Sequence, residues 1–251
     1  MFGITNIGGS CWVNATLQAI FRIPEVQQRY DKLDADSSSA VDTSLQQIWA
    51  SHASRGIPEF FASVKSEDMP AGEGIGDSHE LLVALCDKLP YLDKLLRFGF
   101  GTRIKCNSCP YENIVRESVL EFPLHTSDTA TLSKSIEQSV QVFSDSSWKC
   151  DECKNTGCTQ QHLLAALPKI LVFHRKNVNS PIQYPSVLVL NGIRFAMFAV
   201  VCYNGGHWWT IGRDLPPGKC WHTFDDTTVR KHSPDHFPVA NTMRLLFYAQ
   251  T

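Results

Sequence analysis

The stretch Asn6-Ile7-Gly8-Gly9-Ser10-Cys11-Trp12-Val13-Asn14-Ala15-Thr16-Leu17-Gln18 joins a loop of small residues to the start of a helix. Apolar residues recur at helical spacing after Cys11, and Pro24 ends this run. A thiol at a helix N-terminus lies near unpaired backbone N–H groups and the positive end of the helix dipole, which favour the thiolate. These amides, with the side-chain amide of Asn6, are suited to binding the oxyanion that forms when a thiolate attacks a carbonyl. We therefore expect Cys11 to be a nucleophile, although a lone cysteine is also common as a small buried residue.

The composition is typical of a globular protein. The chain has 251 residues, of which 43% are hydrophobic and 19% charged, enough for one large domain or two small ones. A net charge of −2 indicates no basic face for nucleic acid. No apolar run reaches membrane-spanning length, and residues 2–7 lack the regions of a signal peptide. We expect an intracellular monomer with no nucleic-acid or membrane partner.

Helical and strand patterns occupy different parts of the chain. Helical spacing predicts helices in the first ninety-odd residues, at 12–35, 41–53, after Pro58 and at 77–89, where Asp77 or Ser78 would be the N-cap. Strands are predicted at 103–105, 114–119, 120–124, 170–174, 187–190, 195–202, 207–212 and 245–248, and one helix at 132–142. Helices first and strands later predict an α+β fold.

Two pairs of cysteines have the spacing of a zinc site. Cys106 and Cys109 form one C-x-x-C pair, and Cys150 and Cys153 form the other. A tight turn at each pair would direct two sulfurs at one ion, and four thiolates complete a closed tetrahedral site. We therefore predict a structural zinc ion with no catalytic role, with Cys158 as a possible substitute ligand. The alternative is that one of the pairs lies in the core or is redox-active.

A histidine and an acidic pair near the other end of the chain could complete the chemistry of Cys11. His207 follows two glycines at the start of a predicted strand, and a second short strand at 221–229 carries Asp225 and Asp226. If the strands are neighbours, Asp225 can accept a hydrogen bond from one nitrogen of His207 while the other nitrogen faces the thiol. That is the arrangement of orienting acid, base and nucleophile in cysteine hydrolases. Alternatively, His207 is packed in the core and the acids belong to a solvated turn.

Together these motifs resemble the catalytic domain of the ubiquitin-specific proteases, the papain-like deubiquitinases. The resemblance covers nearly the whole chain, in the family's order, and its elements are the cysteine box at 3–18, the helix box at 76–82, the two C-x-x-C pairs, the Leu-Pro-x-x-Leu strand at 167–171, Gly205-Gly206-His207-Trp208, the Trp-x-x-Phe-Asp-Asp box at 221–226 and Leu-Phe-Tyr at 246–248.

The resemblance implies a papain-like cysteine protease fold built as thumb, fingers and palm. One catalytic domain, 1–251, would comprise a helical thumb at about 1–98, zinc-bearing β fingers at about 99–165 and a β-sheet palm at about 166–251.

The resemblance also implies the roles of the site residues. Cys11 would be the nucleophile, His207 the base and then the acid, Asp225 the orienting residue and Asn6 the oxyanion donor, with Asp226 a lesser candidate in the same site. Asp77 and Glu80 occupy the positions of the family's acids that hold the basic tail of ubiquitin, as carboxylates suit arginine side chains.

The implied activity is hydrolysis of the bond after the C-terminal glycine of ubiquitin, with ubiquitin and its conjugates as partners. Three alternatives stay open: a protease for SUMO or another ubiquitin-like modifier, an inactive ubiquitin-binding module, and a protease embedded in a larger or viral polyprotein. The acidic pair favours ubiquitin, because it gains little from a neutral tail.

The chain departs from the family motifs at a few positions near the site. Gly9 and Ser10 replace Asn-Thr, and Gly76 replaces a glutamine. Trp12 and Trp208 replace the tyrosine or phenylalanine after the cysteine and the histidine. We expect the bulky Trp rings to narrow the cleft around the substrate's Gly-Gly.

Overall fold

The structure is a computed structural model that describes residues 1–32, 39–52, 55–64, 76–122, 131–175, 183–215, 220–233 and 242–251. Most of the predicted loops at 34–39 and 70–76 lie outside these residues. The described helices are α1 (Cys11–Ile20), α2 (Pro24–Lys32), α3 (Ala40–Ser51), α4 (Ile57–Val64), α5 (Ser78–Lys88), α6 (Pro90–Leu96) and α7 (Leu132–Ser139). The strands are β1 (Phe98–Cys106), β2 (Glu112–Val119), β3 (Val142–Lys149), β4 (Thr156–Ala166), β5 (Ile170–His174), β6 (Val187–Leu190), β7 (Ile193–Tyr203), β8 (Trp208–Gly212), β9 (His222–Asp225), β10 (Thr228–Lys231) and β11 (Met243–Gln250).

The helix that carries Cys11 is wholly buried. All ten residues of α1 are shielded from solvent, and the helix packs against β8 and β7 of the larger sheet. The predicted single helix over 12–35 is wrong, because the chain turns at 21–23 and Pro24 opens α2. Proline is tolerated in a first helical turn, where its missing N–H would have no partner, but it breaks a helix interior.

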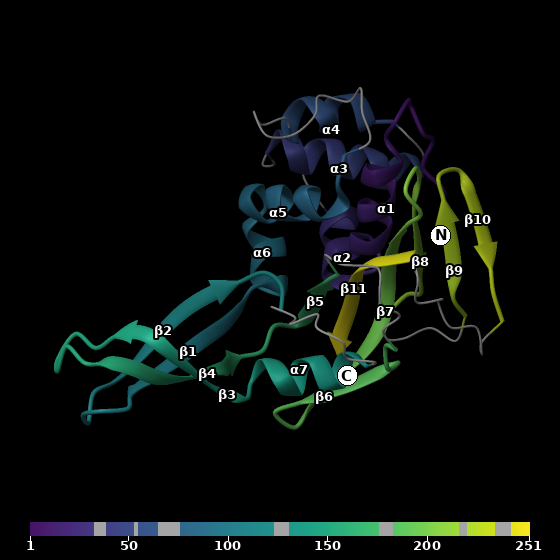
Figure 1. Cartoon of the computed structure of the whole chain (residues 1–251). Coiled ribbons are helices and arrows are strands. Elements are labelled where there is room, and N and C mark those ends of the chain that lie inside the picture. The colour runs from purple at the N-terminus through teal and green to yellow at the C-terminus, as the bar shows by residue number, and fades with distance from the viewer. Residues whose placement is uncertain are drawn as a thin grey trace.

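A seven-stranded sheet forms the centre of the molecule. Its strands follow the order β10-β9-β8-β7-β11-β5, and β6 pairs with β7. Both faces are covered, as the alternation along β11 shows: Leu245 and Phe247 join the core on the side of α1, while Leu246 and Tyr248 join the core on the side of α7. Figure 1 shows α1–α6 gathered on one side of this sheet. The sheet therefore serves as the platform for the residues at its strand ends.

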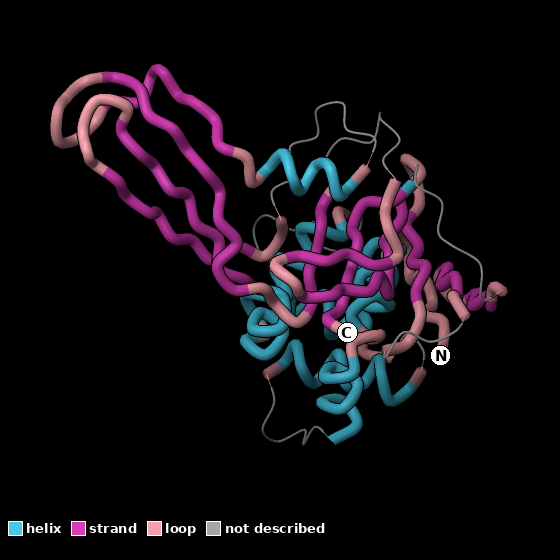
Figure 2. The backbone as a smooth tube through the Cα atoms, turned by 90° about the horizontal axis from the view of Figure 1, so that it is seen from below, coloured by secondary structure: helices cyan, strands magenta, loops and turns pink. Residues whose placement is uncertain are grey.

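A second sheet of four strands, in the order β2-β1-β4-β3, extends away from the rest of the molecule. Figure 2 shows the far end of this sheet projecting away from the other described elements. The predicted strand at 120–124 is wrong: Phe122 makes a single bridge to Phe173, and residues 123 and 124 lie outside the described residues. The division of the chain at about 98 and 165 stays a prediction.

None of the helices within the described ranges has the length and apolar character needed to cross a membrane.

Candidate active site

The loop before Cys11 takes a conformation that favours glycine. Gly8 and Gly9 have φ of 102° and 75°, in the left-handed region that side chains rarely adopt. The Ser10 side chain does not cap α1; its hydroxyl accepts from the Ile7 amide and donates to Asn6 Oδ1. Cys11 is therefore the first residue of an α-helix whose N-terminal amides receive no cap from Ser10, and such amides suit an anionic oxygen.

Asn6 is held in one orientation from both ends of its side-chain amide. Its Oδ1 accepts hydrogen bonds of 3.1 Å from the backbone amides of Gly8 and Ser10. Its Nδ2 donates to Asp226 Oδ2 at 3.1 Å. Because an amide nitrogen carries two protons, this arrangement leaves the second one for another acceptor.

Asp226 ties the start of the chain to α1. Besides Asn6, its carboxylate accepts a bond of 2.7 Å from the side-chain amide of Asn14, one helical turn after Cys11. Its backbone oxygen accepts from the Ile4 amide at 2.9 Å. The residue has a positive φ of 49° in the turn between β9 and β10. Sequence reasoning missed Asn14, although asparagine inside a helix is itself a signal, since it favours caps and turns over helix interiors.

His207 and Asp225 form the predicted pair. His207 Nε2 lies 2.6 Å from Asp225 Oδ1, and both side chains are partly exposed. Asn204 Oδ1 accepts from the His207 backbone amide at 2.9 Å and so fixes the turn that presents the imidazole. With Nε2 engaged by the acid, Nδ1 is the nitrogen left for a thiol or a leaving group.

The histidine strand and the cysteine helix are joined directly. Thr210 Oγ1, on β8 three residues after His207, donates to the backbone oxygen of Ala15 on α1. Asp225 precedes Asp226, which is bonded to Asn14 on the same helix. The structure thus brings Asn6, α1, His207 and both acids into one connected arrangement from segments some 200 residues apart.

Two other buried thiols, those of Cys86 and Cys202, behave as core residues. Burial raises the pKa of Cys86 and of Cys202 to about 12, which leaves both as neutral thiols. Neither therefore competes with Cys11 as a nucleophile candidate.

The expectation that the tryptophans narrow the cleft is wrong. Trp12 and Trp208 are buried, with 1% and 4% of their surface exposed. Trp208 stacks on Tyr203 at a ring distance of 4.4 Å. A Cβ placed on Gly76 would lie 2.6 Å from the Trp12 ring, so the ring occupies the space that a side chain at position 76 would need. Trp12 and Gly76, which both depart from the family motifs, are therefore in contact.

The acids predicted to hold a basic tail lie at the start of α5. Asp77 is the N-cap, and its Oδ1 accepts from the His79 amide at 2.6 Å. Glu80 is exposed in the first turn. The start of α5 is fixed to α1, because Ser78 Oγ donates to the Trp12 backbone oxygen at 3.0 Å. Both carboxylates are thus carried on a helix that packs against the cysteine helix.

The four predicted zinc ligands converge at the end of the four-stranded sheet. Their sulfurs all lie within 4.8 Å of one another, and the pairs Cys106–Cys153 and Cys109–Cys150 are both 3.7 Å apart. Zinc–sulfur bonds of about 2.3 Å in a tetrahedron require sulfurs about 3.8 Å apart, so the four residues fit a zinc ion. The Ser108 amide donates to Cys106 Sγ and is the main cause that lowers the pKa of this thiol to about 7. Cys158 pairs with Cys106 across β1 and β4 but is not part of the set.

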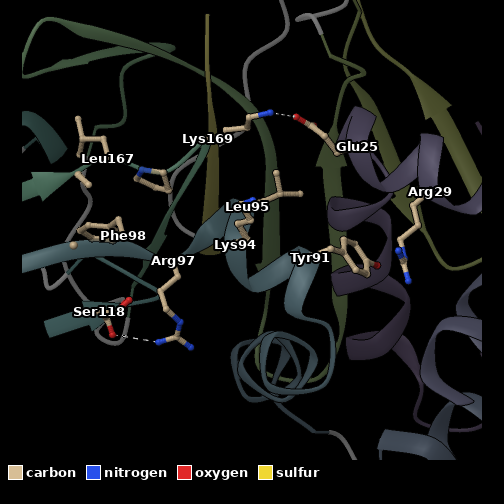
Figure 3. Close-up of a pocket in the computed structure, with 13 residues that line it drawn as sticks. Glu25, Arg29, Tyr91, Lys94, Leu95, Arg97, Phe98, Ser118, Leu167 and Lys169 are labelled. Atoms are coloured by element: carbon tan, nitrogen blue, oxygen red, sulfur yellow. Dashed lines mark hydrogen bonds and ion pairs between the residues drawn. The ribbon is translucent and has the colours of Figure 1, made fainter. Parts of the chain in front are cut away.

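A pocket of about 680 Å³ lies elsewhere, where α2 and α6 meet the base of β1 (Figure 3). Lys169 and Glu25 form an ion pair of 2.9 Å at its edge, and Arg97 donates to the backbone oxygen of Ser118. None of the site residues described above lines it. The candidate site residues therefore lie at the strand ends near α1 and not around this pocket.

The family model described as ubiquitin carboxyl-terminal hydrolase matches residues 2–248. The chain therefore belongs to this family, as the motifs predicted. Ubiquitin carboxyl-terminal hydrolase 17-like protein B of Mus musculus is 24% identical over an alignment that covers 99% of this chain and 63% of that protein. Ubiquitin carboxyl-terminal hydrolase 48 of Danio rerio is 21% identical, covering 91% of this chain and 27% of that protein. The chain spans only 8% of ubiquitin carboxyl-terminal hydrolase 24 of Mus musculus.

Solved structures share the fold. A chain of the SAGA DUB module Ubp8/Sgf11/Sus1/Sgf73 bound to monoubiquitin superposes with a TM-score of 0.82 at 17% identity, covering 100% of this chain and 69% of that one. The same module bound to ubiquitin aldehyde gives a TM-score of 0.81. The predicted α+β fold of the ubiquitin-specific protease type is confirmed.

Proposed function

We propose that this chain is a thiol-dependent deubiquitinase that hydrolyses the bond after the C-terminal glycine of ubiquitin. The observation that carries the proposal is the connected set of His207, Asp225, Asp226, Asn6 and the cysteine helix, joined by hydrogen bonds of 2.6 to 3.1 Å. Membership of the ubiquitin carboxyl-terminal hydrolase family and the likeness to a module solved with ubiquitin give the substrate class.

In the first half-reaction, Cys11 gives its proton to His207 Nδ1 and its sulfur attacks the glycine carbonyl. The negative charge moves to the carbonyl oxygen, which the Asn6 amide and the first backbone amides of α1 stabilise. The C–N bond then breaks, and the imidazolium returns its proton to the departing lysine amine. Asp225 holds the imidazole through Nε2 and stabilises its charged form.

In the second half-reaction, His207 takes a proton from water as the water oxygen attacks the thioester. Collapse of this second oxyanion releases the ubiquitin C-terminus as a carboxylic acid, which loses its proton to solvent, and the Cys11 thiolate, which recovers its proton from the imidazolium. Asp77 and Glu80 act earlier, by pairing with arginines of the extended tail as it enters.

The four cysteines would hold a zinc ion that stabilises the end of the four-stranded sheet. All four ligand positions would be filled by sulfur, so the ion would serve structure. Nine free thiols, four of them in such a site, suit a reducing compartment within the cell.

The test is to react the protein with two electrophilic probes, one built on ubiquitin and one on SUMO. We expect a covalent adduct with the ubiquitin probe alone, and mass spectrometry of the digest should place it on Cys11. Cys11→Ala should form no adduct and should still bind ubiquitin. Capture by the SUMO probe alone would mean that the substrate is SUMO and not ubiquitin. Ubiquitin binding by wild type without any adduct would identify an inactive binding module.

A further inference from the structure

Three ligand-type side chains meet in a second cluster, separate from the zinc cysteines. His79 lies in the first turn of α5, Glu121 follows β2, and His174 ends β5. One atom from each, the two imidazole nitrogens and a carboxylate oxygen, lie within 4.8 Å of one another. These residues come from three separate parts of the chain, and no part of the proposed hydrolysis uses them.

One nitrogen of each imidazole lies beside the Glu121 carboxylate. Glu121 Oε2 lies 2.7 Å from His79 Nε2 and 3.2 Å from His174 Nδ1. Both contacts are ion pairs, but their angles fall outside hydrogen-bond geometry, so the solvent-shielded Glu121 Oε2 and His174 Nδ1 are held by charge alone. Buried polar atoms left this way are costly unless something else binds them. A cation at the centre would satisfy the carboxylate and both imidazoles.

The backbone holds each ligand in place before any ion binds. The amide of Phe122, next to Glu121, donates to the Val172 oxygen of β5 at 3.1 Å, which fixes Glu121 beside the strand that carries His174. His174 itself is paired with Leu245 of β11. His79 is fixed by the bond from its amide to Asp77. The two imidazoles stack at 3.9 Å, so both present an edge to the same carboxylate.

We propose that His79, Glu121 and His174 form a second metal site, which takes a zinc ion with water in the fourth position. Two imidazoles and one carboxylate are a ligand set that zinc accepts when one position stays open. Bonds of about 2.1 Å place tetrahedral ligand atoms about 3.4 Å apart, so the ligand pairs at 2.7 and 3.2 Å need to separate by less than about 1 Å. The stacked imidazole rings also need to turn so that both nitrogens face the ion. The three side chains are 13% to 25% exposed, which leaves a path for the ion.

An ion here would join α5 to the central sheet. His79 lies between Asp77 and Glu80, whereas His174 belongs to the sheet, so the metal would bridge the acid-bearing helix and the platform of the site. The competing interpretation is a plain ion pair in which one imidazolium shares the carboxylate with its neighbour. The two differ in one measurable property, the number of metal ions bound.

The test uses the whole protein, dialysed against a weak chelator until one zinc ion per chain is left at the four cysteines, and then titrated with Co²⁺. We expect one Co²⁺ per wild-type chain, with the visible d–d absorption of a nitrogen and oxygen site and no sulfur charge-transfer band. Glu121→Gln keeps the shape of the side chain but removes its charge, and should weaken Co²⁺ binding by about 100-fold. His79→Gln should do the same.

Two further variants separate this site from others. His52→Asn changes an exposed histidine with a left-handed φ of 51°, a conformation asparagine tolerates, and should bind Co²⁺ as wild type does. His207→Ala should also bind normally, which matters because His207, Asp225 and Asp226 are likewise close together. Thermal melting without added Co²⁺ checks that each variant is folded. Failure of wild type to take up Co²⁺, unchanged binding by Glu121→Gln, or loss of binding in His207→Ala would overturn the proposal.

Discussion

Asn14 and Asp226 lie 212 residues apart in the chain, and the Asn14 side-chain amide donates a hydrogen bond of 2.7 Å to the Asp226 carboxylate. The other carboxylate oxygen accepts from Asn6. One acid therefore fixes both the helix of the nucleophile and the side chain proposed to bind the oxyanion.

Replacing this acid should slow the chemical step. Asp226→Asn leaves a single acceptor oxygen for two amide donors, so Asn6 loses its fixed orientation. An oxyanion-hole donor is worth about 100-fold in kcat or more, and we expect a loss of roughly 10- to 100-fold with little change in KM. Release of a fluorophore from the ubiquitin C-terminus measures both constants. Asp87→Asn, at an exposed position late in α5, is the matched control and should match wild type.

Replacing Asp225, the proposed orienting acid, by asparagine should reduce activity less than replacing it by alanine. Cysteine hydrolases of the papain type use asparagine in this role, so Asp225→Asn can still bond to His207 Nε2. We expect roughly a 10-fold loss of kcat for Asp225→Asn and roughly a 1,000-fold loss for Asp225→Ala, which leaves the imidazole unheld. Equal effects of the two substitutions would contradict an orienting role.

Glu80, in the first turn of α5, should contribute to substrate binding and not to the chemical step. Glu80→Gln removes a charge-assisted hydrogen bond to an arginine of the tail, worth about 1.5 to 3 kcal/mol, and should raise KM by roughly 10-fold or more with kcat nearly unchanged. The KM ratio of variant to wild type should shrink as salt is added, because exposed charges are screened. Glu137→Gln, an exposed acid on α7, should leave KM as it is.

Loss of one zinc ligand should loosen only the far end of the four-stranded sheet. Cys109→Ser should lower the zinc content by one ion per chain and speed hydrogen exchange at the ends of β1, β2, β3 and β4, since removal of a structural ion removes its share of folding energy. Cys158→Ala is the matched control, because its sulfur lies outside the four-sulfur set. A normal zinc content in Cys109→Ser and a reduced one in Cys158→Ala would mean that Cys158 is a ligand.

A double substitution tests the contact between Trp12 and Gly76. Gly76→Gln should cost about 1 to 3 kcal/mol of folding free energy by overpacking against the ring, and Trp12→Phe should cost roughly 1 to 2 kcal/mol by opening a cavity. The double variant should lose at least about 1 kcal/mol less than the sum, as contacting residues do not act independently. Chemical denaturation of the four proteins measures this coupling, and strict additivity would exclude it.

The sequence predicted which residues would lie together at the candidate site better than the hydrogen bonds that hold them there. The His207–Asp225 pair was predictable because each residue lies at the end of a short strand pattern, and neighbouring strands are the common arrangement. The bonds from Asp226 to Asn6 and Asn14 were not, since no local pattern specifies a contact across such distances. β3 was missed for a physical reason: its residues are mostly exposed on both faces, so no alternation of apolar and polar residues marks the strand.

The contact between Trp12 and Gly76 also limits how this chain can have arisen from one with the family's usual pair. A large ring gained first would have collided with a side chain at position 76, whereas glycine gained first would have left only a small void. Glycine at position 76 is therefore the change that makes room for the indole. The same order applies in reverse. A laboratory selection for glutamine at position 76 should therefore succeed only in variants in which Trp12 has already been replaced by a smaller ring.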